Sequence, residues 1–281
     1  MTWQWIYLRN ISSAKPMSSR LKDKWVLITG ASSGFGAAAA RAFGAAGAKL
    51  LLGARRMERL ELVAAEARKA GAPEALVHAL DVSKTASVEK YVAWAKKKLE
   101  VQSSGVGGLH VLINNAGGAH GLDSVAEGKD EDWETMLQTN VLGVLRMTRA
   151  ALPLMPHHAG ASILNIGSYA AHVAYEGGSA YCAAKAGELK ITQVLRLELN
   201  GTGIRVSSID PGLARTEFAM VRFKGDAGRE KKLYEGTQPL VGEDIAEILV
   251  WVAGRPPHVN IDEMLIKPVD QAAMHKVYRR K

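Results

Sequence analysis

Three polar residues in the second half of the chain have the types and spacing of an acid–base site. Tyr181 and Lys185 lie four residues apart, and Ser168 precedes Tyr181 by thirteen residues. On a helix, residues four apart project from the same face. An ammonium held beside a phenol favours the phenolate, so the pair could move a proton at an alcohol or carbonyl oxygen. This spacing also occurs by chance in helices, so it indicates a catalytic pair only together with other motifs in the chain.

A glycine-rich turn near the start of the chain suggests a site for a phosphorylated cofactor. Residues 29–36 read Thr-Gly-Ala-Ser-Ser-Gly-Phe-Gly and separate an apolar run from an alanine-rich segment. Glycines permit a tight turn and close backbone approach, and the N-terminus of the following helix attracts an anion. An ordinary strand-to-helix turn is the alternative. The cofactor contacts expected here are Gly30, Ser32, Ser33, Gly34, Phe35 and Gly36.

Two arginines follow the second apolar run, where a dinucleotide fold usually presents a carboxylate to the adenosine ribose of NAD. The sequence there is Gly-Ala-Arg-Arg and ends with Arg55 and Arg56. Guanidinium groups suit a 2′-phosphate through charge-assisted, often bidentate contacts. The pattern therefore favours NADP(H) over NAD(H). The alternative is that one arginine only begins the next helix and faces water.

Apolar runs alternate with helix-forming segments along most of the chain. Near-continuous apolar strands between helices indicate a parallel sheet covered on both faces, and the right-handed crossover rule favours a doubly wound, Rossmann-type arrangement. The sequence predicts strands at 25–29, 49–52, 75–80, 111–113, 162–166 and 204–209, and helices at 35–46, 58–70, 84–100, 132–152 and 179–199. We therefore expect an α/β fold with a single domain.

The boundaries of this domain are predicted from local composition. Residues 1–16 lack the basic start, continuous apolar region and cleavage site of a signal peptide. Met17 stands shortly before the first strand, so we expect 1–16 to lie outside the fold, as an extension or as the result of an upstream start. The domain would then cover 17–281. Residues 212–239 are rich in charge and glycine and are expected to form a substrate lid at the carboxyl edge of the sheet.

Composition argues against several other classes of protein. The net charge is +8, but the basic residues are mostly spread along helices and cluster only at 275–281, so we expect no nucleic-acid partner. The longest stretch without charge, 150–175, contains prolines and glycines and is not expected to span a membrane. The single cysteine, Cys182, fits a reducing compartment and is either a buried small side chain or a reactive thiol. His157 and His158 lack a third ligand at metal spacing, so no metal site is predicted.

Several motifs occur together in one order, and through them the chain resembles the short-chain dehydrogenase/reductase family over residues 21–269. These motifs are the glycine turn, Asp81-Val82, Asn114-Asn115-Ala116-Gly117, Asn140, Ser168, Tyr181-x-x-x-Lys185 and Pro211-Gly212. The resemblance implies a seven-stranded parallel sheet whose last strand lies near 264–267.

The resemblance also implies a role for each motif. Tyr181 would be the acid/base, Lys185 would hold the nicotinamide ribose, and Ser168 would hydrogen-bond the substrate oxygen. Asn140 would bend the long helix and position a water of the proton relay. Singly, Asn140 could only cap a helix, Ser168 end a strand, and Asn114 belong to a turn. Further cofactor contacts are implied at Asp81, Val82, Asn114, Ala116, Gly117, Tyr181, Lys185, Pro211, Gly212 and Thr216.

Segments beyond the Tyr181 helix are similar to a subgroup of that family, the NADP-dependent 3-hydroxy acid dehydrogenases, which includes serine 3-dehydrogenases. The similar segments are residues 211–213, 216–218, 221–226 and 257–261. The resemblance implies oxidation of the hydroxyl of serine, allo-threonine or a similar small 3-hydroxy acid, or of a secondary alcohol. It also implies a homotetramer in the cytoplasm.

The nature of the substrate stays open at this point. A small hydroxy acid needs its carboxylate neutralised, and Arg222 or Lys224 in the expected lid could do this. Alternatively, both side chains face solvent or pair with Glu217 or Asp226. A general carbonyl or 3-oxoacyl reductase of the same family is the rival enzyme. A protein that binds the dinucleotide without catalysis is the rival from another class.

Overall fold

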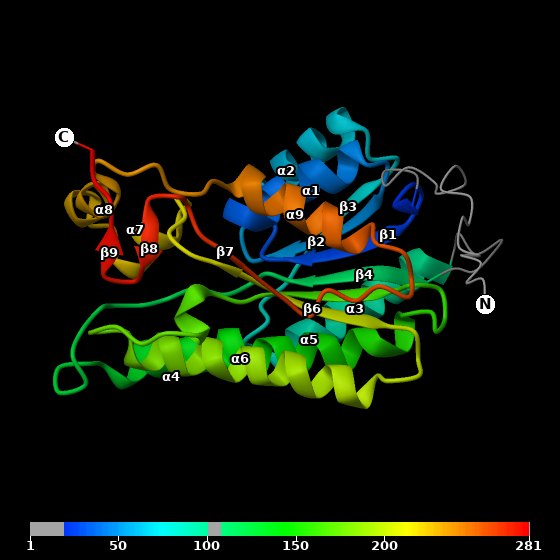
Figure 1. Ribbon diagram of the computed structural model, residues 1–281. Coiled ribbons are helices and arrows are strands. Elements are labelled where there is room, and N and C mark those ends of the chain that lie inside the picture. Colours follow the sequence, from blue (N-terminus) through cyan, green and yellow to red (C-terminus); the bar gives the residue numbers. More distant parts are fainter. Residues whose placement is uncertain (1–19, 101–107, 281) are drawn as a thin grey trace, which may run out of the picture.

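A seven-stranded parallel sheet forms the centre of the computed structural model, which describes residues 20–100 and 108–280 (Figure 1). The strand order is β3-β2-β1-β4-β5-β6-β7, which reverses direction between β1 and β4 as in a doubly wound fold. The strands are β1 (Trp25–Thr29), β2 (Lys49–Ala54), β3 (Ala75–Ala79), β4 (Leu109–Asn114), β5 (Ser162–Ile166), β6 (Arg205–Pro211) and β7 (Glu263–Ile266). The predicted Rossmann-type sheet is confirmed.

Helices cover both faces of this sheet (Figure 1). One layer contains α1 (Gly34–Ala45), α2 (Met57–Ala70) and α9 (Gly242–Ala253). The other contains α3 (Thr85–Glu100), α4 (Asp130–Leu137), α5 (Gly143–Ala151) and α6 (Ser179–Glu198). Successive strand residues point to opposite faces, so Val26 and Ile28 pack under the first layer while Trp25 and Leu27 pack under the second. Burial on both sides explains the continuous apolar strands.

The helix predicted over 132–152 is not continuous. A π-helical turn, η3 (Gln138–Leu142), separates α4 from α5. The side chains of Thr139 and Asn140 donate hydrogen bonds to the carbonyl oxygens of Thr135 and Met136, both at 2.8 Å. Side chains that bond the carbonyl four residues earlier compete with the backbone and open the helical ladder. Asn140 therefore lies in the turn that interrupts the helix.

The segment after β6 contains elements that the sequence did not predict. Two short helices, α7 (Phe218–Arg222) and α8 (Ala227–Tyr234), lie in the expected lid, and α9 follows it. A hairpin of β8 (Gln271–Ala273) and β9 (Lys276–Val277) lies with α7 and α8 at one end of the sheet (Figure 1). The last parallel strand, β7, confirms the one expected near 264–267. The proposed extension 1–16 lies outside the described residues.

None of the helices in 20–100 and 108–280 has the length and apolar character needed to cross a bilayer. The basic end of the chain is also tied to the fold, because Arg280 forms an ion pair with Asp270 and Arg279 donates to the backbone oxygen of Glu235.

One buried histidine gives the fold a testable pH dependence. His110 on β4 is 7% exposed, and its Nε2 lies 3.2 Å from the Nζ of Lys24. Burial and the Lys24 charge lower the pKa of His110 from 6.5 to about 4. At pH values between 4 and 6.5 the unfolded chain binds more protons than the folded chain. The free energy of unfolding therefore falls as the pH falls from 6.5 towards 4.

We expect the free energy of unfolding to drop by about 2 kcal/mol between pH 7 and pH 5 through His110 alone. Urea unfolding of His110→Gln should show a correspondingly smaller drop. His258, an exposed histidine, provides the matched control, and His258→Gln should behave like the wild type. An equal drop in the His110→Gln variant would contradict this assignment.

Candidate active site

The predicted site residues gather at the carboxyl edge of the sheet. The glycine turn follows β1, the arginine pair follows β2, and Asp81-Val82 follow β3. Asn114 ends β4 and residues 115–117 follow it, Ser168 follows β5, and Pro211 ends β6. In an open parallel sheet this edge forms the ligand crevice, next to the point where the strand order reverses. The fold therefore brings together motifs that are far apart in the sequence.

Tyr181 lies in the first turn of α6, where its side chain is 8% exposed. Its ring packs against Phe218 of α7 with the centroids 5.5 Å apart. Ser168 begins the short helical turn η5 (Tyr169–Ala171), and its Oγ accepts a hydrogen bond from the backbone N–H of Ala170 at 3.1 Å. That bond fixes the serine side chain and leaves its O–H available to donate.

Lys185 lies one turn further along α6 and is almost completely buried. Its Nζ donates to the carbonyl oxygen of Ile166 and to the Oε2 of Glu188, both at 2.7 Å. Burial lowers the pKa of Lys185, but the charges of Glu188 and Tyr181 outweigh it and the net direction is upward. The ammonium is therefore retained in a dry environment. Glu188 is a site residue that the sequence analysis missed.

Asn140 joins the π-helical turn to the loop after β4. Its Nδ2 donates to the carbonyl oxygen of Gly118 at 2.9 Å, and its Oδ1 accepts from the N–H of Gly118 at 3.1 Å. A Cβ atom at Gly117 would lie 2.5 Å from the same Oδ1, so only glycine fits there. The amide of Asn140 thus holds the 117–118 backbone in place. The relay water at Asn140 stays a prediction.

The loop after β4 is also held against the glycine turn. Thr29 Oγ1 accepts hydrogen bonds from the N–H groups of Asn115 and Ala116 at 3.0 and 2.9 Å, and Asn115 Nδ2 donates to the Thr29 oxygen at 2.8 Å. Asn114, in contrast, points into the interior and bonds Thr148 and Asn165. Asn115, which was not among the predicted contacts, is therefore the side chain that clamps the turn.

The glycine turn has the shape of an anion cradle. Gly30 and Gly34 have φ values of 65° and 54°, which favour glycine, and a Cβ at Gly30 would lie 2.9 Å from the Cα of Ala116. Ser33 precedes the twelve-residue helix α1, and its side chain makes no hydrogen bond to the first N–H groups of this helix. Thr216 closes the turn, because a Cβ at Gly34 would meet its side chain at 3.5 Å. These features fit the phosphates of a dinucleotide.

Of the two predicted arginines, Arg56 contacts the glycine turn and the segment before α7. Arg56 Nη2 donates to Ser33 Oγ at 2.7 Å and to Glu217 Oε2 at 2.8 Å, and Arg59 also pairs with Glu217. Burial raises the pKa of Glu217, but the hydrogen bonds from Arg56 and Arg59 outweigh it and lower the pKa overall. Because Glu217 is an anion held between two guanidinium groups, this position is suited to a phosphate. Sequence reasoning missed Arg59 and the position of Glu217.

The other expected adenosine contacts lie beside this region. Asp81 Oδ1 accepts hydrogen bonds from the backbone N–H and Oγ of Ser83 at 3.0 and 2.6 Å. Burial raises the pKa of Asp81, but these bonds and the nearby Arg55 charge lower it overall. Val82 is buried and packs against Gly143 of α5. Asp81 is thus an ionised residue at the end of β3, near Arg55.

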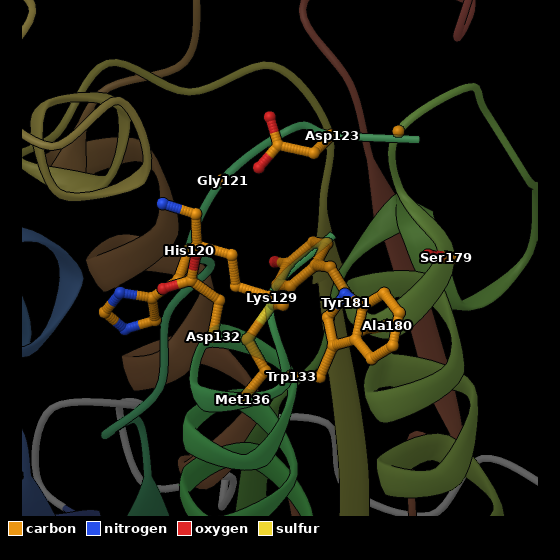
Figure 2. A pocket seen from close by; sticks show the side chains of 11 residues that line it. His120, Gly121, Asp123, Lys129, Asp132, Trp133, Met136, Ser179, Ala180 and Tyr181 are labelled. Atoms are coloured by element: carbon orange, nitrogen blue, oxygen red, sulfur yellow. The ribbon is translucent and has the colours of Figure 1, made fainter. Parts of the chain in front are cut away.

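A pocket beside Tyr181 is formed by the loop after β4, by α4 and by the start of α6 (Figure 2). Trp133 and Met136 supply its apolar part, and His120, Lys129 and Asp132 supply polar groups. Desolvation lowers the pKa of His120 below its usual value, with the charges of Lys224 and Arg55 acting in the same direction and Asp132 opposing them. The pocket is small and has both polar and apolar walls.

Arg222 at the end of α7 covers the Tyr181 region. Its guanidinium carbon lies 5.2 Å from the ring centre of Tyr175 and 5.6 Å from that of Tyr181. Its Nε donates to the Gly121 oxygen at 3.1 Å, while its buried Nη2 has no hydrogen-bond partner among the described residues. Lys224 instead pairs with Asp132 at 2.7 Å on the surface. Of the two candidates for binding a carboxylate, Arg222 therefore has the unused donor.

No group of three or more His, Cys, Asp or Glu side chains in the part of the chain that the structure describes could hold a metal ion. Cys182 is half-buried, and its Sγ lies 3.7 Å from the Val173 oxygen, consistent with a packed thiol.

Comparison with known proteins agrees with this geometry. The family model for short chain dehydrogenases matches residues 24–227. An NADP-dependent 3-hydroxy acid dehydrogenase of Schizosaccharomyces pombe is 40% identical over 263 residues, which cover 93% of this chain and 99% of that protein. A serine 3-dehydrogenase of Agrobacterium fabrum is 39% identical, with coverage of 90% and 98%.

A solved structure, the closed form of a serine dehydrogenase complexed with NADP+, is similar with a TM-score of 0.80 and 38% identity, covering 92% of this chain and 100% of that one. Matches of this extent, together with the Tyr181 site and the glycine turn, establish that the chain belongs to the short-chain dehydrogenase family.

Proposed function

We propose that the protein is an NADP-dependent oxidoreductase that interconverts the hydroxyl group of a small 3-hydroxy acid, such as serine or allo-threonine, with its carbonyl. The observation that carries this proposal is the Nη2 of Arg222 beside Tyr181, which has no hydrogen-bond partner among the described residues, because it joins an anion-binding donor to an acid–base group. The names of the relatives, and the NADP+ bound to a similar structure, support the same chemistry.

In the oxidative direction Tyr181 accepts the hydroxyl proton of the substrate. Lys185 stabilises the ionised phenol by its charge, and Ser168 donates a hydrogen bond to the substrate oxygen as negative charge develops there. When bound, the nicotinamide supplies the acceptor for the hydride. Trp133 and Met136 restrict water on the pocket side, which strengthens these electrostatic interactions.

The preference for NADP over NAD is assigned to Arg56, with Arg59 and Ser33 in support. These three side chains would hold the 2′-phosphate, and the N-terminus of α1 would face the pyrophosphate. Gly30, Gly34 and Gly36 allow the backbone to approach it. Lys185 would hold the nicotinamide ribose, as the family resemblance implies.

We expect Arg222→Met to lower kcat/KM for a 3-hydroxy acid by about 10- to 100-fold, since a charge-assisted contact to the carboxylate is lost. The rate with a neutral secondary alcohol should change by less than about 3-fold. Lys224→Met is the matched control, because it removes a lid cation that already pairs with Asp132. Equal losses on both substrates would show that Arg222 does not bind the carboxylate.

A general carbonyl or 3-oxoacyl reductase is the alternative. The experiment that separates the two is a comparison of NADP-linked oxidation of L-serine, L-allo-threonine, 3-hydroxypropionate and a bulky secondary alcohol by the wild-type protein. The proposal expects the small hydroxy acids to be preferred. Preference for the bulky alcohol, or for an acyl thioester in reduction, would favour the alternative.

We further propose a single domain over 17–281 with a substrate lid at 212–239, assembled as a homotetramer in the cytoplasm without a nucleic-acid partner. Exposed apolar side chains on the α4–α6 layer support self-association: Leu137, Leu142, Leu145, Val194 and Leu197. The single cysteine and the subgroup resemblance support the location. Sedimentation equilibrium would test the assembly, and a monomer at micromolar concentration would contradict it.

A further inference from the structure

A buried carboxylate lies against the catalytic lysine and has no place in the mechanism described above. Glu188 is 1% exposed, and its Oε2 lies 2.7 Å from the Nζ of Lys185, three residues earlier on the same helix. Both side chains are enclosed, so neither charge is screened by water. The Thr192 hydroxyl, one turn further on, bonds the backbone oxygen of Glu188 and leaves its carboxylate to the lysine.

The surroundings show why the lysine needs a partner. A desolvated ammonium loses its proton readily unless an anion lies close to it. On α6 the groups that face Lys185 are Glu188 and Tyr181, and from β6 the carboxylate of Asp210 also contributes. Asp210 is already bonded by Ser208 at 2.6 Å and by His172 at 2.8 Å. Glu188 is therefore the anion in direct contact with the ammonium.

We propose that Glu188 is the counter-ion that keeps Lys185 protonated at alkaline pH, and that it is a positioning residue for catalysis. It touches neither substrate nor cofactor, but it fixes the charge and place of the ammonium that stabilises the ionised Tyr181. Burial raises the pKa of Glu188 to about 7, with Lys185 opposing this rise and Asp210 adding to it. The carboxylate is therefore ionised at alkaline pH, where alcohol oxidation is favoured.

The test is the pH profile of alcohol oxidation by Glu188→Gln, whose amide keeps the size of the side chain and can still accept a hydrogen bond. Without the negative charge, Lys185 should lose its proton earlier. We expect kcat/KM to fall on the alkaline side, with the midpoint of this fall at least about one pH unit lower than in the wild type. Glu188→Asp, which retains the charge, should restore most of the wild-type profile.

The control is Glu198→Gln, which removes an exposed carboxylate from the same helix and should leave the profile unchanged. The wild type provides a second measurement if Glu188→Gln does not fold. The activity of the wild-type enzyme should persist to about pH 10, near the ordinary pKa of lysine. A separate measurement after return to neutral pH shows whether any loss is reversible. A reversible fall well below that pH would overturn the proposal, as would an unchanged profile in a folded Glu188→Gln enzyme.

This inference rests on the proposed dehydrogenase function, and the two can fail separately. A wild type without NADP-linked activity on any alcohol or hydroxy acid refutes the function. An active wild type whose profile is unaffected by Glu188→Gln refutes only the role of Glu188.

Discussion

Tyr181→Phe is expected to lower kcat by about 10²- to 10⁴-fold, the contribution of a positioned general acid–base group. The ring would keep its contact with Phe218, and the phosphates of the cofactor are expected to bind other residues. NADPH should therefore bind to the variant with nearly unchanged affinity. Steady-state oxidation rates and a fluorescence titration with NADPH measure the two effects.

Tyr175→Phe is the matched control for this substitution. Tyr175 lies under the same Arg222 guanidinium, and its replacement by phenylalanine removes only a hydroxyl group beside that guanidinium. We expect it to retain activity within about 10-fold of the wild type, because no general acid–base step is removed. If Tyr181→Phe were as active as this control, Tyr181 could not be the proton-transfer group.

Arg56→Ala is expected to raise KM for NADP by about 10- to 100-fold through the loss of charge-assisted hydrogen bonds. KM for NAD, which lacks the 2′-phosphate, should change little, so the ratio of the two constants is the diagnostic measurement. Arg55→Ala, which removes the adjacent arginine near Asp81, should have a smaller effect. An unchanged ratio in Arg56→Ala would place the phosphate site elsewhere.

Glu217→Gln should lower KM for NADP, whereas Arg56→Ala raises it. Its carboxylate pairs with Arg56 and Arg59, and the 2′-phosphate must compete with it for them. We expect KM for NADP to fall by about 2- to 5-fold, the effect of removing a partly exposed ion-pair partner. A rise in this constant would mean that Glu217 helps to orient the arginines rather than competing for them.

The sheet could be predicted from the sequence because most strands contain a short apolar run and helical segments separate these runs. The boundaries of β1 and β5 agree with the predictions residue by residue. The π-helical turn was not predicted because it depends on the side-chain bonds of Thr139 and Asn140 rather than on hydrophobic periodicity. Helix α9 was missed although its residues are apolar and helix-forming.

The site could be predicted where chemistry depends on local spacing, as with Tyr181 and Lys185. It could not be predicted where residues meet only through the fold. Arg56 and Glu217 are 161 positions apart in the chain, and no local pattern indicates that they form an ion pair. Glu188 was overlooked for a different reason, because a glutamate on a long helix is usually exposed.

The short helix α7 has a consequence for the order in which ligands bind. Glu217, immediately before it, pairs with the arginines of the proposed phosphate site, and Arg222, at its end, lies over the Tyr181 ring. A nucleotide that displaces Glu217 would therefore act on the same short helix that carries the guanidinium proposed to bind the substrate. This linkage favours a compulsory order with the nucleotide first, which would appear as competitive product inhibition between NADP and NADPH and as noncompetitive inhibition by NADPH against the hydroxy acid.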